Sequence, residues 1–108
     1  MLQTETKRAA NKDVAYSNYA ALVYRASIYR VDTTFTKWSL DKAYDLAGEA
    51  YKVNPLPAYQ HQQAQVLYAK GKYKESLDML TALQQTDLGK TGEVYYESAQ
   101  CKARLNAP

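Results

Sequence analysis

Few residues in this chain of 108 have side chains suited to catalysis or metal binding. The one histidine, His61, and the one cysteine, Cys101, lie far apart in the sequence. No cluster of Cys and His has the spacing of a metal site, and a single cysteine cannot form an internal disulfide. A catalytic pair, with Cys101 as nucleophile and His61 as its base, is one interpretation. A packing role between helices explains the presence of Cys101 more simply. We therefore expect no catalytic residue, no metal ligand and no cofactor.

The charged clusters give little evidence of a ligand site. Asp41, Asp45 and Glu49 recur every four residues, the spacing of a solvated edge along a helix. Three lysines crowd one turn: Lys70, Lys72 and Lys74. No glycine-rich loop accompanies them to bind a phosphate, so their charge is expected only to keep the turn in water.

The net charge of +3 is too small for a dedicated nucleic-acid-binding domain. Residues 1–37 carry six Lys and Arg against three Asp and Glu, whereas residues 38–108 carry eight of each kind. The excess therefore belongs to a polar N-terminal segment. We expect no nucleic-acid partner, and a basic module that contacts nucleic acid is the least favoured of the functions considered below.

Two observations concern membranes and the compartment. No apolar run approaches the ~20 residues needed to cross a bilayer, so no membrane span is expected. The segment from Met1 to Lys12 has no apolar core and is not a secretory signal. The compartment stays open: cytoplasmic if Met1 is the native start, exported or periplasmic if the chain is a segment of a longer protein.

The stretch from Pro57 to Leu88 predicts two helices joined by a turn at Gly71. Apolar residues recur at helical spacing on both sides of this glycine. Gly71 stands where the chain must reverse, because glycine adopts the left-handed conformation without a steric cost.

Helices are also expected on either side of this hairpin. The segment 13–31 has no Gly or Pro and is expected to form a helix capped by Asn11 or Asp13. Its side chains are apolar nearly all round the helix, so other parts of the protein must cover it on several sides. Phe35 and Trp38 are expected in a short loop that fills the space between helices. A second helix is then expected from Leu40 to Val53, with Ser39 as its cap and two prolines after its end. A fifth helix is expected at 93–105.

Two of these helices share one pattern at a shift of 33 residues. The matched pairs are Leu40 and Tyr73, Ala43 and Ser76, Tyr44 and Leu77, Ala47 and Leu80, and Ala50 and Leu83. A period in this range is typical of a helical solenoid.

With small residues at Ala43, Ala64 and Ser76 and a turn at Gly71, the chain resembles the tetratricopeptide repeat (TPR) family. The resemblance implies an all-α, TPR-like solenoid of about five helices, in which an insertion around residues 32–37 enlarges the first hairpin. The expected single domain divides into a flexible N-terminus (1–12), the enlarged first hairpin (13–55), a second hairpin (57–90) and a capping helix (91–106).

In this family the first helices of successive repeats line a concave groove that takes a peptide or a partner helix. Carried over to this chain, the resemblance implies a partner-binding groove lined by Asn18, Leu22, Arg25, His61, Gln62, Gln65, Tyr68, Tyr96 and Gln100, with Glu97 and Arg104 beside them.

The expected function is therefore a non-enzymatic protein–protein interaction module that binds a protein or peptide partner in this groove. The alternative is a structural role, in which the apolar first helix forms a homodimer or the chain is one segment of a larger solenoid.

Overall fold

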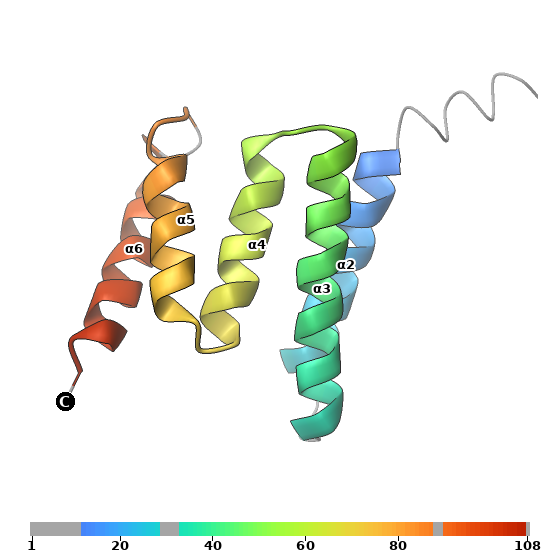
Figure 1. Ribbon diagram of the computed structural model, residues 1–108, viewed down its shortest axis with the longest axis horizontal. Helices are drawn as coiled ribbons and strands as arrows, with labels where there is room; N and C mark the ends of the chain where they lie inside the picture. The colour runs from blue at the N-terminus through green and yellow to red at the C-terminus, as the bar shows by residue number, and fades with distance from the viewer. Residues whose placement is uncertain (1–11, 29–32, 88–89, 108) are drawn as a thin grey trace, which may run out of the picture.

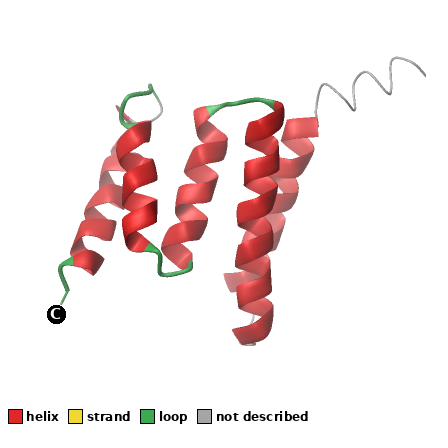
Figure 2. Cartoon of the chain, in the orientation of Figure 1, coloured by secondary structure: helices red, strands yellow, loops and turns green. Residues whose placement is uncertain are grey.

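In a computed structural model, the described residues are 12–28, 33–87 and 90–107. They form the helices α2 (Lys12–Ile28), α3 (Thr33–Val53), α4 (Pro57–Ala69), α5 (Tyr73–Leu83) and α6 (Gly92–Leu105). The described part of the chain contains no strand, which confirms the all-α prediction (Figure 2). None of these helices is long and apolar enough to span a membrane.

Helices that follow one another in sequence pack side by side and run in opposite directions (Figure 1). The contact between α2 and α3 is the most extensive, and α2 also touches α4. In the view of Figure 1, α2 lies behind α3 and α6 lies behind α5, with α4 between the two pairs. This arrangement leaves α2, α4 and α6 running in one common direction.

Proline and glycine define the connections, as the sequence predicted. Helix α3 ends at Val53, before two prolines, and Pro57 is the first residue of α4, where its missing N–H costs nothing. Gly71 has a φ of 81° and reverses the chain between α4 and α5. The flexible N-terminus was predicted to span 1–12, but Lys12 is already the first residue of α2. Residues 1–11, with the predicted cap Asn11, and the last predicted turn of the first helix lie outside the described residues.

The core consists of three clusters of buried side chains. One joins α4, α5 and α6 through Ala64, Leu80, Leu83, Val94 and Cys101. Another joins α2 to α3 through Ala20, Val23, Leu46 and Ala47, and the third joins α3 to α4 through Leu40, Ala43 and Val66. Each cluster lies between helices that are neighbours along the chain.

Residues 33 positions apart in α3 and α5 are buried to similar extents. Ala43 and Ser76 have no exposed surface, and the pairs Ala47 with Leu80 and Ala50 with Leu83 expose at most 1%. Tyr44 and Leu77 are both partly buried, whereas Leu40 is buried and its counterpart Tyr73 only partly buried. The two helices therefore agree in burial at four of the five matched pairs.

The predicted start of the second helix was wrong. Helix α3 begins at Thr33, so Phe35 and Trp38 are helical and do not form a loop, and Ser39 lies inside the helix instead of capping it. No Gly or Pro stands between Thr33 and Val53 except Gly48, so nothing ends the helix earlier. Trp38 is 52% exposed and packs on Phe35 one turn before it, with ring centroids 5.9 Å apart. It does not fill the space between helices.

Candidate partner-binding groove

A hollow of about 240 Å³ opens where α2, α3 and α4 meet. Its lining is mostly apolar: Ala20, Ala21, Tyr24, Arg25, Ala43, Gln62, Gln65 and Val66. The alanines make it possible, because their short side chains leave space between helices that otherwise pack closely. Arg25 supplies the only charged group of this lining.

A second hollow of about 280 Å³ adjoins the first. Its lining is more polar: Tyr24, Ala64, Gln65, Tyr68, Ser76, Leu80, Glu97, Gln100 and Cys101. Tyr24 and Gln65 line both hollows, so the two form one continuous depression across α2, α4 and α6. We call this depression the groove.

The structure brings together five of the nine predicted groove residues. Arg25, Gln62, Gln65, Tyr68 and Gln100 line the groove. Four others do not: Asn18, Leu22, Tyr96 and His61. Leu22 and Tyr96 are 62% and 66% exposed, because they project from the outer sides of α2 and α6.

Sequence reasoning missed Tyr24, although a signal for it was present. Tyr24 follows Ala20 and Ala21 by four and three residues, which places all three on one face of a helix. The tyrosine is partly buried, and burial raises the pKa of its hydroxyl, with the charge of Glu97 adding to the effect. Tyr24 is thus the side chain from α2 that reaches both hollows.

Gln62 fixes the spacing of α2 and α4. Its amide oxygen accepts a hydrogen bond from the Ser17 hydroxyl at 2.6 Å, and its amide nitrogen donates to the Ser17 carbonyl at 3.2 Å. One wall of the groove is therefore held by a pair of hydrogen bonds between side chains and backbone 45 residues apart in sequence.

An aromatic and cationic group closes the other end of the groove. The ring of Tyr68 packs edge-on against Tyr73, with centroids 5.1 Å apart. The guanidinium of Arg104 lies 5.9 Å from the Tyr73 ring centroid and donates to the Tyr68 hydroxyl at 3.3 Å. These contacts hold Tyr68 in place on α4 and join it to α6.

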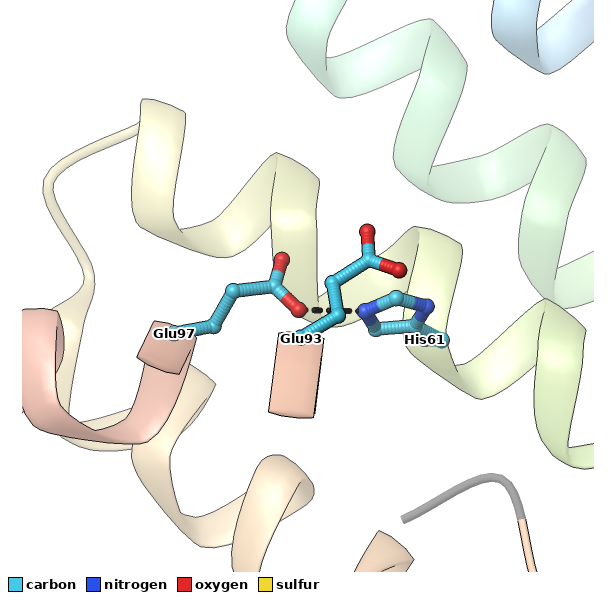
Figure 3. A group of neighbouring side chains, drawn as sticks. All are labelled: His61, Glu93 and Glu97. Carbon is cyan, nitrogen blue, oxygen red and sulfur yellow. Dashed lines mark hydrogen bonds and ion pairs between the residues drawn. The ribbon is translucent and has the colours of Figure 1, made fainter. Parts of the chain in front are cut away.

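His61 is buried beneath this surface, where it meets two carboxylates from α6 (Figure 3). Its Nε2 lies 2.5 Å from Oε1 of Glu97. The hydrogen bond to Glu97 raises the pKa of His61 above its ordinary value; burial of the ring opposes this effect, and the charges of Glu97 and Glu93 reinforce it. Sequence spacing around His61 could not indicate this cluster, because its partners come from a helix more than thirty positions further along the chain.

The lysine-rich turn is not only a solvated loop. Lys70 pairs with Asp41 of α3 at 2.6 Å, and this contact lowers the pKa of Asp41. A hollow of about 550 Å³ lies beside the pair, lined by Thr36, Lys37, Leu40, Asp41, Ala69, Lys70 and Lys72. Because one of its three lysines is already paired, this hollow is a weaker candidate site than the groove.

Comparisons of this chain with protein-family models, with curated proteins and with solved structures gave no match.

Proposed function

We propose that this chain is a non-enzymatic protein–protein interaction module that binds a peptide or a partner helix in the groove. The proposal includes a TPR-like architecture, in which α2 with α3 and α4 with α5 are successive hairpins and α6 caps the second. It rests chiefly on one observation: two adjoining hollows share Tyr24 and Gln65, so a single depression crosses the three helices α2, α4 and α6.

The burial pattern supports the repeat architecture. Four of the five matched pairs 33 residues apart in α3 and α5 are buried alike, as expected of equivalent second helices in neighbouring hairpins. In such a stack the first helices line one common face. The groove lies on α2, α4 and α6, which would be those first helices.

The lining of the groove suggests what it binds. The first hollow offers alanine and tyrosine surface with Arg25 at its edge, whereas the second offers amide and hydroxyl groups near Glu97. A segment with apolar side chains and an acidic residue over Arg25 would match the first hollow. Polar residues of the same segment would pair with Gln65, Tyr68 and Gln100.

Neither Cys101 nor His61 is free to act in catalysis. Cys101, the one thiol, has no exposed surface and packs in the core cluster of α4, α5 and α6. His61 is engaged with Glu97. A binding role uses the groove residues as they stand and needs neither group to react.

A peptide-library selection followed by affinity measurement tests the proposal. Gln65→Trp would fill the junction of the two hollows, and Arg25→Ala would remove the charge at one edge. We expect each substitution to lower the affinity for the selected peptide by on the order of tenfold or more. Gln85→Trp is the matched control, because Gln85 is exposed between α5 and α6 and does not line the groove. Unchanged affinity in both groove variants, with their folds intact by circular dichroism, would rule the groove out.

One observation favours self-association as a second candidate function. Four large apolar side chains of α2 are 44–63% exposed: Val14, Tyr19, Leu22 and Ile28. A helix that exposes this much apolar surface can be covered by a second copy or by a further hairpin of a larger solenoid.

Sedimentation velocity separates the two candidates. A homodimer through α2 should persist at low micromolar concentration in the wild type and dissociate in Leu22→Glu. Leu22 does not line the groove, so this substitution should leave peptide binding unchanged. A wild type that is monomeric at all concentrations would remove the support for self-association.

A further inference from the structure

Three potential metal ligands meet between α4 and α6. His61 on α4 faces Glu93 and Glu97, which are one turn apart on α6 (Figure 3). One ligand atom from each residue lies within 4.8 Å of the other two. The three groups therefore surround a space that a single ion could occupy after small side-chain movements.

The cluster differs from ordinary acidic patches on a protein surface. His61 is only 9% exposed, and the side chain of Glu97 is 17% exposed. Two carboxylates elsewhere pair with a lysine instead: Asp41 with Lys70 and Glu49 with Lys52. Within the described ranges, no Lys or Arg forms an ion pair with either glutamate of the cluster. Two carboxylates beside one imidazole thus keep a negative charge even when the imidazole is protonated.

The donor set indicates the kind of ion. Calcium and magnesium prefer oxygen ligands alone, whereas one imidazole with two carboxylates suits zinc and neighbouring divalent transition metals. Three protein ligands also leave a fourth tetrahedral position for water. Glu93 is exposed, which gives an ion access to the site from solvent.

We propose that His61, Glu93 and Glu97 bind one divalent transition-metal ion of the zinc type, which cross-links α4 to α6. The ion would replace the direct contact between His61 and Glu97 by bonds from both residues to the metal. Because Glu97 also lines the second hollow, the bound metal would lie at the edge of the groove. The site does not depend on peptide binding, so either proposal can fail without the other.

Calorimetric titration of the whole, chelator-treated chain with Zn²⁺ tests this site, with Co²⁺ absorption as a second readout. We expect one ion per chain and a higher melting temperature with metal. Glu93→Gln should weaken Zn²⁺ binding by about tenfold or more. Its side chain is exposed and forms no hydrogen bond or ion pair in the described parts of the chain, so this variant should fold normally. His61→Ala should abolish binding.

Glu75→Gln is the matched control, because it makes the same substitution at an exposed glutamate on α5. This variant should bind Zn²⁺ as the wild type does. Two outcomes would overturn the proposal. One is the absence of saturable Zn²⁺ binding at micromolar concentrations. The other is equal affinity in the wild type, Glu93→Gln and His61→Ala, which would place the ion elsewhere.

Discussion

The hydroxyl of Ser76 donates a hydrogen bond of 2.7 Å to the backbone carbonyl of Ala64. Both residues are completely buried between α4 and α5. The short side chain of serine can reach a carbonyl on the neighbouring helix only where the two backbones come close, which small residues permit. This contact therefore sets the packing distance of the hairpin that presents Gln65 and Tyr68 to the groove.

We predict that Ala64→Leu destabilises the fold by about 1–3 kcal/mol, because the larger side chain has no space between α4 and α5. Chemical denaturation measures the loss. Ala82→Leu is the control: Ala82 is exposed on α5, so the same enlargement should change the free energy of unfolding by less than about 0.5 kcal/mol. Equal losses in the two variants would contradict the close contact at Ala64.

Two buried serines should respond in opposite directions to replacement by alanine. Ser76→Ala removes the bond to the Ala64 carbonyl and should cost about 1 kcal/mol. Ser39 is equally buried on α3, but its hydroxyl has no hydrogen-bond partner among the described residues. Ser39→Ala should therefore stabilise the fold by about 1 kcal/mol, since it removes a buried, unpaired polar group. Urea titrations of both variants check the signs, and a loss of stability in Ser39→Ala would show that its hydroxyl is paired.

The sequence was most informative where single residues control the backbone. Gly71 and the prolines at 55 and 57 mark real helix ends, because their effects on φ and on hydrogen bonding are local. The predicted start of α3 was wrong for the opposite reason. Ser39 has the chemistry of a cap, but no Gly or Pro stands before it to stop a helix, and packing of the elongated helix against α2 outweighs the local preference.

The same distinction between local signals and packing applies to the candidate sites. Gln65 and Tyr68 could be assigned to one face from helical spacing within α4 alone. The cluster at His61 depends on how α6 returns beside α4, and this relationship between distant helices has no counterpart in local spacing. Asp13 illustrates the same point: expected to act as a cap, it lies within the first turn of α2 and bonds to residues more than forty positions away.

Gly48 lies in the middle of α3 and faces α4. A methyl group at this position would come within 3.0 Å of the Gln63 side-chain amide, which is the end of a flexible side chain and can move aside. Gly48→Ala should then gain most of the helix-propensity difference of about 1 kcal/mol. Thermal unfolding of this variant should show a higher melting temperature than the wild type. A lower melting temperature would mean that the contact between Gln63 and α3 is too rigid to adjust.

Asp13 ties α2 to the start of α4. Its carboxylate accepts hydrogen bonds from the Tyr59 hydroxyl at 2.7 Å and from the Asn54 amide at 3.3 Å. The bond from Tyr59 lowers the pKa of Asp13 below its ordinary value, although removal of the carboxylate from water acts in the other direction. Because the pKa is lower in the folded state than in the unfolded chain, ionised Asp13 stabilises the fold above the unfolded pKa, and this contribution is lost as pH falls through the folded pKa.

Asp13→Asn keeps an oxygen that can accept the bond from Tyr59 but cannot ionise. We expect the wild type to melt at a higher temperature than Asp13→Asn near neutral pH. The difference should shrink as the pH falls below the ordinary pKa of an aspartate, about 3.9, and on through the lowered pKa of folded Asp13. Calorimetry across this range measures the difference, with Asp45→Asn as the control because Asp45 is exposed on α3. A difference between wild type and Asp13→Asn that stays constant from neutral to acid pH would show that the charge of Asp13 does not stabilise the junction of α2 and α4.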